Sequence, residues 1–340
     1  MSDLLPGSVG RSAWSAVLVG LFLLTIVSTI SFVVGARVIS LERIFRLFLV
    51  DDPWSFDGIV LFDYRLPRTL LGLLSGAAFG VSGALIQAAT RNPLADPGIL
   101  GVNAGAAFFV TLAVGLLGFH SINSYIWFAL LGAVVVTFAV YIIGATGREN
   151  ATPVRLVLAG VALSAVLGGL GSAITLLDPQ AFDALRLWAI GSIAGRDMHV
   201  VVWVAPFIGL GLVIALIAAR SLNAVALGDD LARSLGTNIL RTRILSVIGV
   251  TLLAGAGTAA CGPIGFIGLM VPHAMRWLIG PDQRLIIPLT MIYAPVLLLL
   301  ADIVGRLVLY PNEMEAGIVT AFIGAPVLIF LARRRQASGL

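Results

Sequence analysis

The sequence predicts an all-α polytopic membrane protein with ten transmembrane helices. Of its 340 residues, 59% are hydrophobic and 11% are charged, whereas about a quarter of the residues in an ordinary soluble domain carry a charge. Several apolar runs reach the roughly 20 residues that an α-helix needs to cross a hydrocarbon layer of about 30 Å. These runs take up most of the chain, so we expect residues 1–340 to form a single transmembrane domain.

Hydropathy and the positions of glycine and proline place the ten spans in order along the chain. The first apolar run, Trp14 to Gly35, is too long for a signal-peptide core and lacks a small-residue cleavage site, so we expect it to be retained. The eighth span is short and follows Gly262 and Pro263, which indicates a partial or broken helix. The predicted spans are residues 14–36, 68–90, 98–118, 124–145, 154–177, 200–219, 244–261, 263–279, 285–307 and 316–332.

The distribution of arginine orients these spans. An even number of spans places both termini on one side, and the three consecutive arginines at 333–335 mark that side as cytoplasmic by the positive-inside rule. Thirteen of the 21 arginines fall on the same side. The sequence therefore predicts a multi-pass protein of a bacterial inner membrane with both termini in the cytoplasm.

Glycine spacing predicts close packing of the second span. Gly72, Gly76 and Gly80 recur every fourth residue and share one helix face, so a neighbouring backbone can approach closely. The stretch 73–76 with Gly83 also matches the stretch 252–255 with Gly262 at a constant offset of 179. One interpretation is an inverted repeat that relates helices 2–5 to helices 7–10. The other is chance similarity between two helices rich in glycine and alanine.

Composition argues against chemistry within the chain. Every basic residue is arginine, and without a lysine the chain cannot form a Walker A phosphate loop or a Schiff base. Cys261 is the single cysteine, so no intrachain disulfide is possible. The three histidines are scattered, and no metal-ligand spacing or catalytic constellation is present. We therefore expect neither an enzyme nor a metal or cofactor site.

An amphipathic segment separates the sixth and seventh spans. Leu227, Leu231 and Leu235 recur every four residues, Gly228 and Gly236 punctuate the ends, and Asp229, Asp230 and Arg233 lie between them. A short helix beneath the bundle, apolar on one side and charged on the other, suits docking into a groove of a partner. The alternative is an interfacial helix that lies on lipid headgroups.

Polar side chains near and within the spans form a second group of candidates. Arg65, Arg68 and Arg306 lie at predicted outer helix ends, where arginine either extends to lipid phosphates or pairs with carboxylates of a partner. Asp302 lies four residues before Arg306, so the two side chains can pair on one helix face. The polar residues within spans either line a pathway or bond to a neighbouring helix; they are Gln87, Asn103, Thr175 and Thr320.

Seven motifs resemble the permease family of ATP-binding-cassette (ABC) importers for iron-siderophores, haem and vitamin B12. The resemblance covers residues from about Leu61 to Arg335, and its closest likeness, at 153–167 and 185–188, is to the D-type permease subunits of ferric enterobactin importers. The motifs are RLPRTL at 65–70, NPLADPGILGVNAGA at 92–106, VRLVLAGVAL at 154–163, ALGDDLARSLG at 226–236, GPIGFIGLMVPHAMRW at 262–277, LLLLADIVGR at 297–306 and GIVTAFIGAPVLIFLARR at 317–334.

The resemblance implies a type II importer permease fold with ten transmembrane helices. Its expected partners are a second homologous permease (a heterodimer), two cytoplasmic ATPases that bind ATP and Mg²⁺, and an outer substrate-binding protein. The implied solute is a ferric siderophore, of the catecholate type if it is like enterobactin, and no nucleic acid is involved. This chain would bind no cofactor of its own.

The resemblance also assigns roles to residues. Arg65, Arg68 and Arg306 would meet acidic residues of the binding protein. The inner gate would fall on the loop with Leu94 and on the loop with Thr152 and Pro153, and Pro153 departs from the polar pair of vitamin B12 permeases. Gln87 and Asn103 would lie along the path. Segment 223–240 would couple to the ATPase through Leu227, Gly228, Asp229, Asp230, Ala232, Arg233, Leu235 and Gly236.

Three alternatives remain open. Haem or cobalamin could replace the siderophore within the same family. An ion-coupled secondary transporter would usually carry an acid or histidine relay in its spans, and here the middle of the spans is nearly free of ionisable residues. A channel or membrane scaffold would need neither ATP nor a docking partner.

Overall fold

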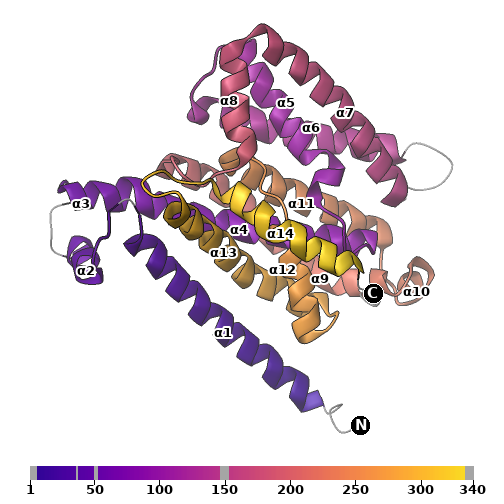
Figure 1. The fold of residues 1–340 in the computed structure, drawn as a ribbon. Helices are drawn as coiled ribbons and strands as arrows, with labels where there is room; N and C mark the ends of the chain where they lie inside the picture. The colour runs from indigo at the N-terminus through magenta and orange to yellow at the C-terminus, as the bar shows by residue number, and fades with distance from the viewer. Residues whose placement is uncertain (1–5, 36, 50–52, 146–152, 334–340) are drawn as a thin grey trace.

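The computed structural model describes residues 6–35, 37–49, 53–145 and 153–333. Every regular element in that part of the chain is a helix (Figure 1). The elements are α1 (Pro6–Val33), α2 (Leu41–Leu49), α3 (Phe56–Ile59), η1 (Val60–Arg65), α4 (Leu66–Thr90), η2 (Pro97–Leu100), α5 (Val102–Gly115), α6 (Ile122–Ala145), α7 (Pro153–Leu177), α8 (Pro179–Ile190), α9 (Met198–Ala226), α10 (Asp229–Ser234), α11 (Ile239–Cys261), α12 (Ile267–Ile279), α13 (Gln283–Val308) and α14 (Ala316–Arg333).

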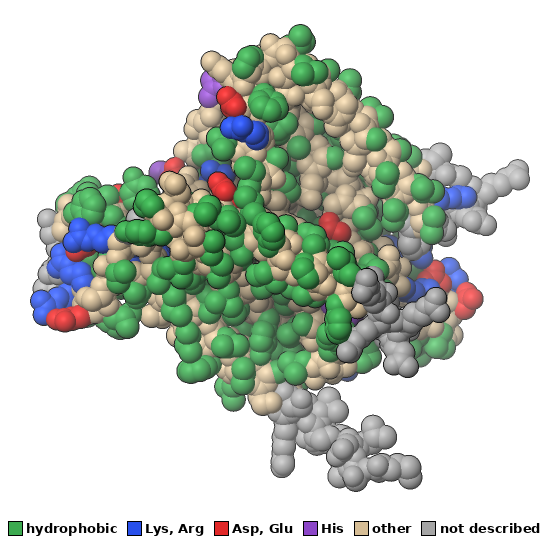
Figure 2. All heavy atoms as spheres, in the orientation of Figure 1, with side chains coloured by type: hydrophobic (Ala, Val, Ile, Leu, Met, Phe, Trp, Pro, Cys, Tyr) green, Lys and Arg blue, Asp and Glu red, His purple; other side chains and the backbone are tan. Residues whose placement is uncertain are grey.

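Each of the ten predicted spans coincides with one of these helices. Among the described residues, seven helices are long and apolar enough to cross a membrane, and α5, α12 and α14 are shorter apolar helices. The count of ten transmembrane helices therefore stays a prediction. Figure 2 shows hydrophobic side chains over the middle of one face, with charged side chains gathered at its left and right ends and a smaller number in its upper part. That distribution is typical of a protein whose middle lies in lipid.

The structure corrects several predicted boundaries and adds helices. Helix α9 continues to Ala226, seven residues beyond its predicted end. Helix α8 has 12 residues, too few to be found by a search for spans, and it begins where the Asp178 side chain accepts a hydrogen bond from the N–H of Gln180. At the left of Figure 1, α2 and α3 precede α4, whereas α10 lies at the right.

Helix α4 forms the centre of the bundle. It contacts α13, α11, α9 and α12, and 18 of its 25 residues are buried. A Cβ on Gly76 would lie 2.5 Å from Cα of Pro295, and one on Gly83 would lie 2.0 Å from the carbonyl oxygen of Gly268. Both distances are shorter than van der Waals contact. Glycine therefore permits the backbone approach that its spacing predicted.

The contacts between α4 and α11 support the inverted repeat. Three residue pairs join the two helices: Ser75 with Cys261, Phe79 with Gly257, and Leu85 with Gly249. Residue numbers therefore rise along α4 in the direction in which they fall along α11. The two helices are antiparallel. Helix α4 also packs on α12 and α13, as α11 packs on α5 and α6, which is the contact pattern expected for helices 2–5 and 7–10 related by a pseudo-twofold axis.

Candidate functional site

The segment between α9 and α11 contains one short helix, as expected from the sequence. Helix α9 ends at Ala226, the short helix α10 spans Asp229–Ser234, and α11 begins at Ile239. Gly228 (φ 111°) and Gly236 (φ 77°) adopt positive φ angles, which interrupt the helical path on either side of α10. The two glycines thus turn the chain at the ends of α10, as their positions predicted.

Helix α10 presents an apolar edge to the outside of the molecule. Leu227, Leu231 and Leu235 are 61%, 49% and 61% exposed, whereas Ala232 between them is fully buried. Asp230 pairs with Arg233 within the helix at 3.0 Å, and both side chains are exposed. Three exposed leucines beside exposed charges form a surface suited either to a partner protein or to a lipid interface.

Asp229, in contrast, is bonded within the chain. Its Oδ1 accepts a hydrogen bond from Nη2 of Arg91, and its Oδ2 accepts one of 2.8 Å from Nη2 of Arg243. Nε of Arg91 also donates to the carbonyl of Val225 at 2.7 Å. Sequence reasoning grouped Asp229 with Asp230 as neighbours on a docking helix and missed this network. Arg91 lies 138 residues from Asp229, and nothing in the spacing of Arg243, 14 residues away, pairs it with Asp229 rather than with Asp230.

The loop after α4 carries Leu94, the first candidate gate residue. Arg91 ends α4 in a left-handed conformation (φ 51°), and the side chain of Asn92 accepts a hydrogen bond of 3.0 Å from the N–H of Leu94. Asp96 begins η2 and accepts a hydrogen bond of 2.8 Å from the N–H of Gly98, and burial raises the pKa of the Asp96 carboxyl group. Leu94 itself is 45% exposed.

The second candidate gate falls at the edge of the described part of the chain. Thr152 lies outside the described residues, and Pro153 is the first residue of α7. The position of proline at the start of a helix agrees with its fixed φ and its missing N–H.

Of the four polar candidates within spans, Gln87 and Asn103 bond to neighbouring helices, whereas Thr175 and Thr320 each donate to a carbonyl of their own helix. Gln87 is fully buried, its Nε2 donates to the carbonyl of Gly268 at 2.9 Å, and its Oε1 accepts a hydrogen bond of 3.2 Å from Arg276. Asn103 accepts a hydrogen bond of 3.0 Å from Thr258, which joins α5 to α11. In this conformation Gln87 lies inside a contact between α4 and α12, not on an open path.

Two of the three candidate docking arginines, Arg68 and Arg306, bind one carboxylate at the opposite end of α4 from Arg91. Arg68 donates to both oxygens of Asp302, with its closest contact at 2.7 Å, and Arg306 pairs with the same carboxylate, as its spacing predicted. Arg68 also pairs with Glu313 at 2.7 Å. Asp302 is 1% exposed, and the Arg306 side chain is 2% exposed. Neither the Arg68–Asp302 pair nor Glu313 was foreseen from the sequence.

Arg65 and Arg306 bind the end of α1. Arg306 donates to the carbonyls of Ser31 and Val34, each at 2.9 Å. Arg65 donates to the carbonyls of Phe32, Val33 and Arg37. These guanidinium groups satisfy carbonyls that lack helical partners at a helix end. In this conformation the buried side chains of Arg65 and Arg306 therefore connect their own helices to the end of α1. Among the three arginines, Arg68 has a partly exposed partner, Glu313, whose side chain is 37% exposed.

Comparison with known proteins identifies the family. The model of the FecCD transport family matches residues 22–334. The chain belongs to the FecCD transport family. It is 45% identical over 335 residues to the ferric enterobactin transport system permease protein FepD of Escherichia coli (strain K12), covering 98% of this chain and 100% of that protein. It is 33% identical over 326 residues to the hemin transport system permease protein HmuU of Yersinia pestis, covering 94% of this chain and 96% of that protein.

Solved structures show the same fold. A chain of a transporter assigned to the metal-chelate type of ABC transporters, in an inward-facing conformation, superposes with a TM-score of 0.82 at 28% identity and covers 95% of this FecCD chain and 99% of its own length. PsaBC from Streptococcus pneumoniae gives a TM-score of 0.61 at 17% identity, over 83% of this chain and 95% of that one. The fold is therefore that of an ABC type II importer permease.

Asp302→Asn should destabilise this FecCD chain by about 3–5 kcal/mol, because it leaves the buried Arg306 guanidinium without its counter-charge and Arg68 with Glu313 alone. Thermal and denaturant unfolding of the purified protein in detergent measures the loss. The matched control is Asp183→Asn, which removes a 3.8 Å pair with Arg186 between side chains that are 67% and 62% exposed. That change should cost less than about 1 kcal/mol. Equal stabilities for the two variants would contradict the structural role of Asp302.

Proposed function

We propose that this chain carries a ferric siderophore of the catecholate type across a bacterial inner membrane, as one permease subunit of an ABC importer. Membership of the FecCD family establishes the importer permease for iron-type substrates. The observation that carries the finer proposal is the 45% identity to a ferric enterobactin permease over the whole of both chains. Haem is the second candidate solute, supported by the 33% identity to a hemin permease.

The energy for transport comes from partners in this proposal. A chain without lysine has no Walker A lysine to bind ATP phosphates. Two cytoplasmic ATPases would bind ATP and Mg²⁺, a second homologous permease would complete the pore as a heterodimer, and an outer binding protein would deliver the solute. In this proposal the chain itself binds the partners and forms part of the transport path.

The exposed leucines of α10 orient the chain in this proposal. Leu227, Leu231 and Leu235 face the ATPase, and Gly228 and Gly236 set the position of α10 relative to the bundle. The end of the molecule with α10 is then cytoplasmic, in agreement with the arginine asymmetry, and both termini lie on that side. Ala232 is buried against the bundle and anchors α10, so a push on the leucines reaches α9 and α11.

The opposite end receives the binding protein. Arg68 is the best-placed docking residue, because an acidic side chain of the binding protein can replace Glu313 while Asp302 keeps Arg68 oriented. Arg65 and Arg306 then act by holding α1 against this site. Reversing all three charges would break buried bonds, so a docking test requires a milder change at Arg68 or Glu313.

Alternating access requires two arrangements that differ by a few kcal/mol and that nucleotide and docking can bias. We assign the inner seal to the loop with Leu94, and to Thr152 and Pro153 where α7 begins. The hydrogen bonds of Gln87 to α12 and of Asn103 to α11 belong to one arrangement, and they are the contacts that would exchange as the path opens.

Ferric catecholate should accumulate in vesicles only when the second permease, the ATPases, the binding protein and ATP are all present. Iron-chelate uptake into reconstituted vesicles measures this directly, with haem and cobalamin as competing solutes. Preference for haem or cobalamin would overturn the catecholate assignment alone. Uptake by the permease without the ATPases, driven by an ion gradient, would contradict the proposed mechanism.

Leu231→Asp should reduce co-purification of the ATPases with the permease, because it places a charge in an apolar contact. The expected loss of affinity is about 10- to 100-fold, as is typical of a central interface residue. The matched control is Leu177→Asp at the end of α7, where the leucine is 87% exposed. If the Leu231→Asp variant co-purifies with the ATPases as well as the unsubstituted protein does, α10 is an interfacial helix that contacts lipid and not the ATPase.

A further inference from the structure

Asp229 is the point at which three elements meet. It is the first residue of α10. One of its carboxylate oxygens accepts a hydrogen bond from Arg91, where α4 ends, and the other accepts one from Arg243, in the second turn of α11. A single side chain thus ties α10 to both α4 and α11, the two antiparallel helices at the centre of the inverted repeat.

Arg91 connects this junction to the loop that carries Leu94. It ends α4 with a left-handed backbone, and its side chain is held by the carbonyl of Val225 as well as by Asp229. The loop that follows has internal bonds, with the N–H of Asn92 on the carbonyl of Gln87 at 3.1 Å and the N–H of Ala95 on the carbonyl of Asn92 at 3.1 Å. A displacement of Arg91 therefore moves a compact loop rather than one flexible residue.

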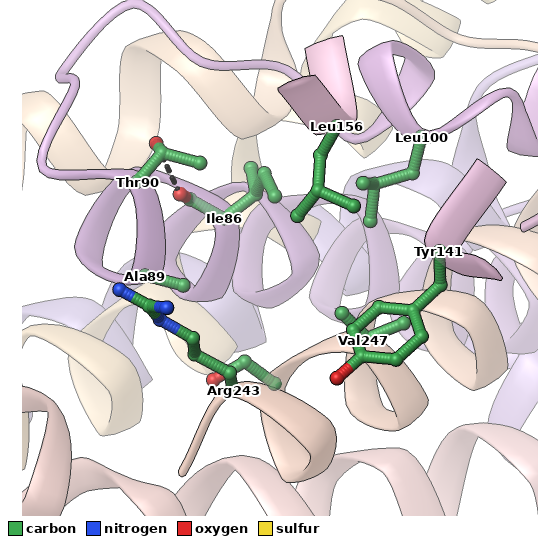
Figure 3. A pocket seen from close by; sticks show the side chains of 9 residues that line it. Ile86, Ala89, Thr90, Leu100, Tyr141, Leu156, Arg243 and Val247 are labelled. Carbon is green, nitrogen blue, oxygen red and sulfur yellow. Dashed lines mark hydrogen bonds between the residues drawn. The ribbon is translucent and has the colours of Figure 1, made fainter. Parts of the chain in front are cut away.

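Arg243 holds the carboxylate from the other side. Figure 3 shows its side chain extending from α11 toward Ala89 on α4. Arg243, Ile86 and Thr90 line a cavity of about 30 Å³ between the two helices. That volume is enough for a water molecule, so the inner ends of α4 and α11 are not fully packed against each other at this point.

The chemistry of the junction makes Asp229 irreplaceable by an uncharged residue. Charge-assisted hydrogen bonds are stronger than neutral ones, and without the carboxylate two guanidinium groups would face each other. Asp229 is 28% exposed, whereas Asp230 beside it is fully exposed and pairs with Arg233 inside α10. Adjacent aspartates in the sequence thus have different structural roles.

We propose that Asp229 is a positioning residue that transmits movement of α10 to the loop at 91–96 through Arg91, with Arg243 holding its carboxylate in place. This inference rests on the proposed function, in which α10 receives the ATPase. It adds a specific route by which a push at α10 reaches the candidate gate at Leu94.

The test compares two fluorescent reporters in the complete, reconstituted transporter. One is attached to a cysteine at Ser234 in α10, and the other to a cysteine at Leu94. Cys261 is fully buried and does not compete for the label. In the otherwise unsubstituted protein, both reporters should respond to ATP. In Asp229→Asn, the reporter at 234 should still respond, while the response at 94 and the solute transported per ATP hydrolysed should each fall about tenfold. Asp183→Asn is the control, because this exposed aspartate of α8 pairs with Arg186 away from α10, and it should leave both responses intact.

Two further variants separate transmission from folding. Asp229→Glu keeps the charge and should recover much of the response at 94, with thermal stability of each variant measured alongside. The double variant Arg91→Gln with Asp229→Asn tests whether the two residues act through one contact. Because each substitution removes the same contact, the double variant should transport as much solute per ATP hydrolysed as the weaker of the two single variants.

Each outcome decides the inference. A full response at 94 in Asp229→Asn, or losses that multiply in the double variant, would overturn the link while leaving the coupling role of α10 in place. If the fluorescence of the reporter at position 234 does not change when ATP is added to the transporter without the Asp229 substitution, two proposals fail. These are the route through Asp229 and Arg91, and the coupling of α10 to the ATPase.

Discussion

The close backbone approach of α4 to α12 and α13 is the constraint on which the rest of the structure depends. It is possible because Gly76 and Gly83 have no side chain where Pro295 and Gly268 lie. The 25 residues of α4 extend about 37 Å at 1.5 Å per residue, so one buried helix joins both ends of the molecule. Its beginning holds the arginine cluster around Asp302, and its end holds Arg91. Surfaces on opposite sides of the membrane are thereby connected through a single element.

Periodicity predicted the features that repeat along one helix. The apolar runs gave the spans, the glycine spacing gave the close face of α4, and the four-residue spacing of Asp302 and Arg306 gave their ion pair. Each of these depends on residues whose relative positions helical geometry fixes.

Features that depend on distant partners could not be predicted in this way. Arg68 and Asp302 lie 234 residues apart, and Arg91 and Asp229 lie 138 apart. Nothing in the spacing of Asp229 and Asp230 separates them, because only the fold brings Arg91 and Arg243 to one of the two. Helix α8 escaped prediction for a different reason, since its 12 residues fall below the length of a membrane span and mix polar with apolar side chains.

The central claim is that this FecCD permease is driven from its cytoplasmic side through α10. The most direct measurement is site-specific cross-linking from position 231 in the complete transporter, followed by identification of the cross-linked chain. We expect position 231 to cross-link to the ATPase, with a yield that changes when ATP is added. A cross-link from position 231 to the outer binding protein, or to lipid alone, would contradict it.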